Sequence, residues 1–177
     1  GKFANGGFFD DTDDYIDLSG PVPFNPQTTE FTAAIWFNYA NLTSPTTDNI
    51  ITQNDGGGTG RVWFQISAAT DHLTSFLGGV STDSGFIPPT GPGAWTHAVL
   101  VKRGTGISGH TIEIYVNGTF QFSATVNVES ATSGSLRFGR AKGSTGTNWF
   151  NGIMDEIRIY NTALSAAQVT QLYNLVP

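Results

Sequence analysis

Apolar residues recur at every second position along much of this chain. Side chains two residues apart in a strand point to the same face, so this spacing is typical of strands with one buried face. The clearest examples are Ile112, Ile114 and Val116, then Phe120 and Phe122, and later Ile153, Ile157 and Ile159. The pattern therefore predicts a chain built mainly of strands.

A tight hairpin is predicted within residues 112–120. Asn117-Gly118 stands between two alternating runs, and both residues tolerate the positive φ angles of a type I′ turn. Further strands are predicted at residues 15–18, 31–39, 49–53, 62–67, 73–77, 96–102 and 136–139. Turn-rich stretches separate the strands at residues 55–60, 84–93, 104–109 and 142–148.

Only the C-terminal end has the pattern of a helix. Ser165 is a good N-cap, and an apolar stripe at i, i+3, i+4 and i+7 follows it, which we expect to pack on a sheet. The stripe consists of Val169, Leu172, Tyr173 and Val176. Strands and helices do not alternate, so the pattern excludes a doubly wound parallel sheet and predicts an all-β, antiparallel two-sheet sandwich with one short helix.

Length and repeats indicate how the domain is organised. The 177 residues suit one domain, and neither an internal repeat nor a long linker interrupts them. We expect residues 1–177 to form a single domain that belongs to a larger multidomain protein.

Composition narrows the classes of function. Only 12% of the residues are charged, the net charge is −6, and Lys and Arg number eight. Nucleic-acid binding depends on Lys and Arg that displace counterions, so no nucleic-acid partner is expected. No run approaches the roughly 18 apolar residues that span a bilayer, so membrane insertion is not expected. The absence of Cys removes disulfides, thiol nucleophiles and cysteine-bound zinc.

Two sequence patterns that could indicate a nucleotide or zinc site are not supported by their surroundings or spacing. Residues 104–109 (GTGISG) match a dinucleotide-binding fingerprint, but that site needs a helix after the loop, and a strand is predicted there. His72, His97 and His110 are scattered and lack the i, i+4 spacing of a zinc helix. Outside the N-terminal acidic run, no strand carries the closely spaced carboxylates of a glycosidase. We therefore expect no enzymatic activity.

Both ends of the chain resemble a known family. Residues 1–6 (GKFANG) with 9–18 (FDDTDDYIDL) resemble the opening of the laminin-G-like, concanavalin A-like jelly-roll domains of bacteria, and residues 150–161 (FNGIMDEIRIYN) resemble their ending. Residues 31–37, 95–98 and 114–118 follow in the family's order. The resemblance implies a two-sheet antiparallel jelly roll, frequently with a structural calcium, and often a carbohydrate-binding or adhesive role. One departure is Asp11, where relatives usually have Gly.

Acidic residues on apolar strand faces suggest a bound cation. Period two places Asp155 on one face with Ile157 and Ile159, and Asp14 on one face with Ile16. A carboxylate on an apolar face is costly unless it is paired or bound to a metal, and Ca²⁺ prefers oxygen ligands. We predict a calcium where the first and last strands meet. Its predicted ligands are Asp155, Asp14, Asp13 and Asn5. The alternative is a solvated acidic turn, with Asp155 bonded to backbone N–H groups.

The family resemblance makes a glycan the expected ligand. Sugars stack on aromatic rings, while polar side chains bond their hydroxyl groups. Trp36 and Trp95 match family positions expected in the core. Trp63 and Trp149 border polar, glycine-rich loops and are the predicted platforms. The predicted ligand-binding residues are Trp63, Trp149, Arg61, Gln65, Arg140 and Asn148.

These features predict a non-catalytic carbohydrate-binding module of a secreted or cell-surface bacterial protein, monomeric and stabilised by calcium. The alternative is an adhesion or protein-interaction module without affinity for sugars. A small glycan hydrolase or lyase is a third hypothesis.

Overall fold

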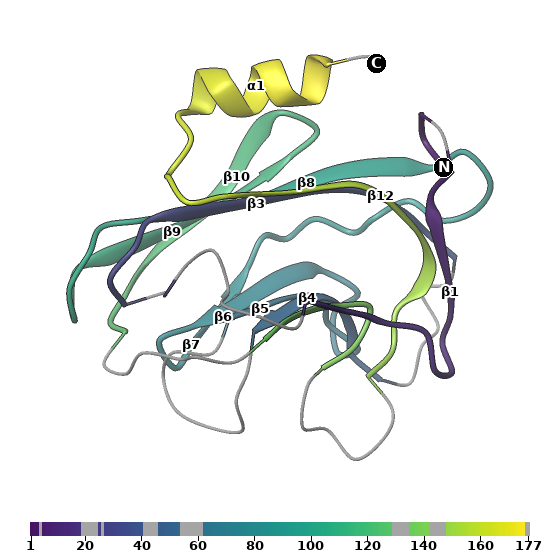
Figure 1. Ribbon diagram of the computed structural model, residues 1–177, viewed down its shortest axis with the longest axis horizontal. Coiled ribbons are helices and arrows are strands. Elements are labelled where there is room, and N and C mark those ends of the chain that lie inside the picture. Colours follow the sequence, from purple (N-terminus) through teal and green to yellow (C-terminus); the bar gives the residue numbers. More distant parts are fainter. Residues whose placement is uncertain are drawn as a thin grey trace.

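Two antiparallel sheets lie face to face, and the C-terminal helix lies on the outer face of one of them (Figure 1). The structure is a computed structural model that describes residues 1–3, 5–18, 25, 27–40, 46–53, 62–128, 135–141 and 148–175. The prediction of an all-β, two-sheet antiparallel jelly-roll sandwich is confirmed.

Each sheet has six strands within the described residues. Sheet A runs in the order β1 (Gly7–Asp10), β12 (Asn151–Tyr160), β3 (Phe31–Tyr39), β8 (Trp95–Arg103), β9 (His110–Val116) and β10 (Thr119–Val126). Sheet B runs in the order β2 (Ile16–Leu18), β11 (Leu136–Phe138), β4 (Asp48–Gln53), β5 (Val62–Ile66), β6 (Leu73–Leu77) and β7 (Val80–Asp83).

The core lies between the two sheets and is built from alternating side chains. In β3, Phe31, Ile35 and Phe37 face the core, whereas Ala34 and Trp36 lie on the outer face of sheet A. In β5, Val62, Phe64 and Ile66 face the core from sheet B. The period-two alternation of the sequence therefore decides which side chains meet between the sheets.

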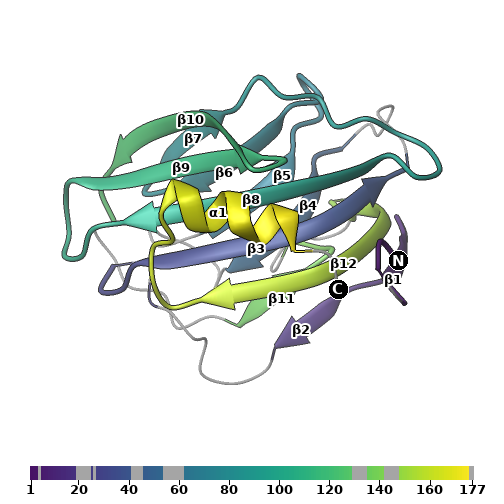
Figure 2. The same cartoon turned by 90° about the horizontal axis from the view of Figure 1, so that it is seen from above.

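Helix α1 (Ala166–Asn174) covers the outer face of sheet A, above β3 and β8 (Figure 2). Ser165 and Gln168 form a capping box, in which each side chain accepts a hydrogen bond from the other residue's backbone N–H. Val169 and Leu172 are buried against Val99 and Val101 of β8. The predicted helix and its packing stripe are confirmed for these residues, while Val176 lies outside the described part of the chain.

The predicted strands are confirmed with small shifts at their ends, and two short strands were missed. β1 has four residues and begins with glycine, and β7 (VSTD) has one apolar residue, so neither shows alternation. The predicted type I′ turn is confirmed, because Asn117 and Gly118 have φ angles of 50° and 76°. Residues 104–109 form a loop that leads into β9, not into a helix. The predicted turn region 55–60 lies outside the described residues.

A bulge in β12 corrects one prediction about strand faces. The pairing of β12 with β3 is irregular between Asp155 and Arg158, and Glu156 has a φ of 52°. Met154 faces the core before this point, whereas Ile157 packs against the core after it. Because the extra residue reverses the alternation, the prediction that Asp155 shares a face with Ile157 and Ile159 is wrong. Asp155 instead lies opposite Trp36 on the outer face of sheet A.

We expect Gly152→Ala to destabilise the sandwich through a backbone clash. Gly152 has a φ of 147°, and a Cβ atom there would lie 2.1 Å from the carbonyl oxygen of Asn38 on the neighbouring strand. Gly79→Ala is the matched control, because Gly79 has a φ of 78° but no atom within 4 Å of the added Cβ. Both variants carry the cost of a positive φ. In urea unfolding, the free energy of unfolding of Gly152→Ala should fall by about 2 kcal/mol more than that of Gly79→Ala. Equal losses would contradict the proposed clash.

Candidate functional site

The outer face of sheet B carries a pair of aromatic rings on neighbouring strands. Trp63 and Gln65 alternate with the core residues of β5 and therefore point outward. Phe76 of β6 lies directly opposite Trp63, and the two ring centroids are 5.3 Å apart with 35° between the planes. Both rings are half-buried, so part of each contacts solvent.

A second aromatic group lies near the end of β11. Arg140 and Trp149 form an isolated bridge, and the Arg140 guanidinium lies 4.0 Å from the centroid of the Trp149 ring. Tyr15 lies 6.2 Å from Trp149, and the Arg137 guanidinium is 4.4 Å from the Tyr15 ring. Arg137 also binds the carboxylate of Asp17 at 2.5 Å. Rings and guanidinium groups therefore alternate, an arrangement stabilised by cation–π attraction.

Residues Arg140 and Asn148 contact the outer face of sheet B through their backbone carbonyl groups. Thr52 of β4 lies opposite both Trp63 and Arg137, and its hydroxyl donates a hydrogen bond to the Arg140 carbonyl at 2.8 Å. The side-chain amide of Asn49 donates to the Asn148 carbonyl at 3.2 Å. These hydrogen bonds hold the Arg140–Trp149 bridge against β4, the strand next to Trp63.

The structure places five of the six sequence-predicted ligand residues on or beside this face. They are Trp63, Gln65, Arg140, Asn148 and Trp149, while Arg61 lies outside the described residues. Trp36, expected in the core, is buried beneath α1, and Trp95 is half-buried.

Sequence reasoning missed three residues at this face, namely Tyr15, Phe76 and Arg137. Phe76 lies between core-facing Ser75 and Leu77, so alternation alone could have placed it on the outer face. Arg137 and Tyr15 gave no such signal, because their contacts join strands that lie about 120 residues apart.

Three aspartates gather in the turn between β1 and β2. Carboxylate oxygens of Asp10, Asp13 and Asp14 all lie within 4.8 Å of one another. Asp14 accepts a hydrogen bond from the backbone N–H of Asp10, which shapes the turn. Asp11 has a φ of 65°, a conformation in which glycine is unstrained. Burial and the nearby Asp10 charge raise the pKa of the Asp11 carboxyl, a sign of crowded negative charge.

The oxygens of these three aspartates fit the shell of one calcium ion. Ca²⁺ binds oxygens at about 2.3–2.6 Å, so two ligands of one ion can lie up to about 5 Å apart. The structure therefore brings Asp13 and Asp14 together, with Asp10 as a member that the sequence did not predict.

Asp155 and Asn5, the other predicted metal ligands, lie away from this turn. Asp10 pairs with Asn151, and four further residues along β12 put Asp155 about 13 Å away. The two Asp155 carboxylate oxygens accept hydrogen bonds from the backbone N–H groups of Phe3 and Glu156, at 3.1 and 2.9 Å. Asn5 is exposed and precedes β1 at the Asp155 end of that strand pair. Asp155 thus holds the N-terminal segment against the bulge of β12.

The three histidines remain apart from one another. His72 pairs with Asp83 at 2.8 Å beside sheet B, His97 is buried beneath α1, and His110 contacts the Gly106 carbonyl. Within the described residues, the Asp10–Asp13–Asp14 group is the one cluster of three or more acids, histidines or cysteines with metal-binding geometry.

The sequence matches the family described as the concanavalin A-like lectin/glucanases superfamily over residues 10–170. The chain therefore belongs to this laminin-G-like family. Comparison with curated proteins gives no match. No helix in the described part of the chain has the length and apolar character needed to cross a membrane.

Solved structures share the fold at low sequence identity. A Bacteroides ovatus protein, described as a candidate carbohydrate-binding protein, is 20% identical with a TM-score of 0.71, and the match covers 94% of this chain but only 46% of that one. Domain 4 of an extracellular arabinanase from Geobacillus stearothermophilus, in complex with arabinotriose, is 20% identical with a TM-score of 0.60 and coverages of 97% and 89%. The CBM40 domain of a Ruminococcus gnavus sialidase, bound to α2,3-sialyllactose, is 11% identical with a TM-score of 0.63 and coverages of 93% and 98%. At these identities the likeness shows the fold alone.

We expect Asp155→Ala to destabilise the domain by about 1–3 kcal/mol, because two backbone N–H groups would lose their acceptor. Asp13→Ala is the control, since Asp13 is exposed and its loss should change stability by less than about 0.5 kcal/mol without metal. Urea unfolding in the presence of a chelator measures both. An Asp155 variant as stable as the Asp13 variant would show that these hydrogen bonds contribute nothing.

Proposed function

We propose that this domain is a non-catalytic carbohydrate-binding module of a secreted or cell-surface bacterial protein, and that the outer face of sheet B binds the glycan. One observation carries the proposal: two groups of aromatic rings and several hydrogen-bonding side chains gather on this sheet face. Helix α1 packs over Trp36 on the opposite outer face, that of sheet A, whereas Trp63 and Phe76 on sheet B stay partly exposed.

The chemistry of this face suits a sugar. A sugar ring has an apolar C–H face that packs on an aromatic ring, while its hydroxyl groups donate and accept hydrogen bonds. Trp63 and Phe76 offer ring surface beside the amide of Gln65. Trp149 and Tyr15 offer ring surface beside the guanidinium groups of Arg140 and Arg137. Apolar surface with a few placed polar groups is typical of small-molecule sites.

The similar structures support this proposal. One is described as a candidate carbohydrate-binding protein, one holds arabinotriose and one holds sialyllactose. The arabinanase is described as extracellular, in line with a secreted or surface location for this module. We infer binding without turnover, because these structures are described by carbohydrate binding or by a bound sugar.

A structural calcium is part of the proposal. Asp10, Asp13 and Asp14 would hold it in the β1–β2 turn, where it would neutralise the repulsion among crowded carboxylates. Asp155 is not included, since backbone N–H groups already engage both of its oxygens.

Glycan retention tests the binding face. In affinity electrophoresis against a polysaccharide panel that includes arabinan, we expect at least one polysaccharide to slow the native domain. Trp63→Ala and Trp149→Ala should each weaken that binding about tenfold or more, because each removes about 1.4 kcal/mol or more of stacking. Phe120→Ala is the control, since this ring is exposed on β10 of sheet A.

Three outcomes would count against the proposal. Retention that neither tryptophan variant weakens would place the glycan elsewhere. No retention by any polysaccharide would favour an adhesion or protein-interaction module. Release of reducing ends would show that the domain is an enzyme.

Calcium binding is tested by thermal unfolding. At a calcium concentration 100 times its Kd, the free energy of unfolding of the native domain should rise by about 2.7 kcal/mol. The domain should therefore melt at a higher temperature than in chelator. Asp13→Asn should lose most of this gain. Asp71→Asn, which removes the same charge from a different loop, should keep it. A melting temperature unaffected by calcium or chelator would overturn the proposed site.

A further inference from the structure

The N-terminal segment and the C-terminal helix pack against the same tryptophan. The Phe3 ring meets the Trp36 ring edge-on with centroids 5.7 Å apart, and Tyr173 of α1 stacks on Trp36 at 5.5 Å. Lys2 lies 4.9 Å from the centroid of the same ring. Trp36 is thus the point on sheet A where both ends of the described chain are held.

His97 lies at the centre of this contact. Its ring is 5.0 Å from Trp36 and 5.8 Å from Tyr173, and only 2% of the residue is exposed. The backbone of His97 is bonded to Asn117, through its N–H and its carbonyl. Its buried Nδ1 atom has no hydrogen-bond partner in the described residues. A protonated imidazole would therefore have no hydrogen-bond acceptor for Nδ1 among the described residues.

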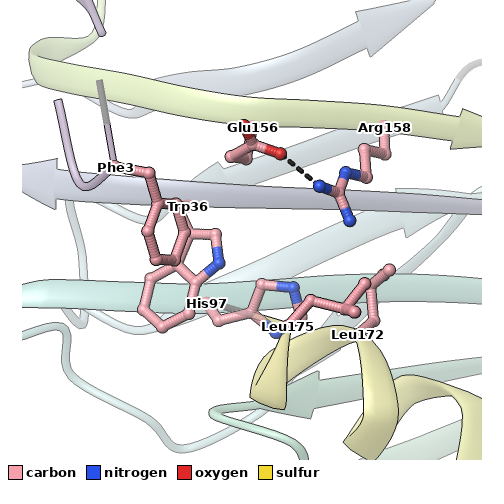
Figure 3. A pocket seen from close by; sticks show the side chains of 7 residues that line it. All are labelled: Phe3, Trp36, His97, Glu156, Arg158, Leu172 and Leu175. Carbon is pink, nitrogen blue, oxygen red and sulfur yellow. Dashed lines mark hydrogen bonds and ion pairs between the residues drawn. The ribbon is translucent and has the colours of Figure 1, made fainter. Parts of the chain in front are cut away.

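The charges around His97 oppose its protonation. Figure 3 shows His97 beside Trp36, with Glu156 and Arg158 of β12 above them and Leu172 and Leu175 at the helix end, around a cavity of about 10 Å³. Glu156 is already paired with Arg158, and Asp155 is engaged by backbone N–H groups. Lys2 adds a second positive charge from the N-terminal segment, whereas α1 carries no charged residue. Burial and the Arg158 charge lower the pKa of His97 to about 4.

We propose that His97 is an acid-sensitive latch, whose protonation releases helix α1 from sheet A while the two sheets stay packed together. Releasing the helix exposes the imidazole to water, which satisfies Nδ1 and solvates the positive charge. The inner core does not depend on this contact, because its residues lie between the sheets, whereas Trp36 and Val169 lie on the outer side of sheet A.

The direction of the effect follows from linkage. A histidine exposed by release has a pKa near 6.5, and the docked residue has a pKa of about 4. Released protein therefore binds more protons than docked protein between these values, and docking weakens as the pH falls through this window. The opening constant of α1 should rise about 30-fold between pH 7.5 and pH 5, where Asp and Glu carboxylates remain mostly ionised.

Hydrogen exchange measures this opening directly. Protection factors for Ala166–Asn174, corrected for intrinsic rates at each pH, give the opening constant of α1. In the native domain we expect the opening constant of α1 to rise as the pH falls. Core strands such as β3 and β5 should keep their protection. His97→Phe keeps an aromatic ring but cannot be protonated, and it should abolish the rise. His72→Phe, which alters the half-buried histidine beside sheet B, should leave the rise intact.

Several results would overturn the latch. These are a pH-independent opening constant, a rise that persists in His97→Phe, or loss of protection in α1 and the core strands together. If His97→Phe fails to fold, titration of His97 by NMR in the native domain decides the question. A pKa of 6 or above would then exclude the mechanism.

Discussion

Burial of apolar side chains between two antiparallel sheets is the constraint on which the rest of this structure depends. The regular strands contribute every second residue to the layer between the sheets, as Phe31, Ile35 and Phe37 do in β3 and Val62, Phe64 and Ile66 do in β5. The remaining residues must lie on an outer face, because successive side chains of a strand point to opposite sides. The core therefore determines which residues are available for any other task.

The two outer faces use their aromatic residues differently. On sheet A, Trp36 is covered by Tyr173 and Phe3, so it joins the chain ends to the sandwich. On sheet B, Trp63 lies beside Phe76, and both rings remain partly accessible. The difference comes from α1, which has a single apolar stripe and can cover one face only. Sheet B consequently keeps two neighbouring rings partly exposed, on the face proposed to bind a glycan.

The charged side chains of this protein make different kinds of contact. Asp155 serves as an acceptor for backbone N–H groups at the β12 bulge, and Arg137 joins Asp17 to the Tyr15 ring. The crowded carboxylates of Asp10, Asp13 and Asp14 are different, since they face one another across a short turn. A cation would relieve their repulsion, and this is why the acidic character of the chain suggests calcium more strongly than it suggests a basic partner.

The sequence by itself determined the strands, the Asn117-Gly118 turn and the capped helix, because alternation, turn chemistry and capping are local properties. From their position beside polar loops it also predicted Trp63 and Trp149 as glycan-binding residues, which stays a prediction. Only the tertiary structure decided that Asp155 lies on the outer face, because a bulge at Glu156 reverses the alternation without a clear sequence signal. Only the tertiary structure, likewise, places Tyr15 beside Trp149 and packs Phe3 and Tyr173 against Trp36. These contacts join segments more than 30 residues apart, so they exist only once the sheets have paired and fixed which strands are neighbours.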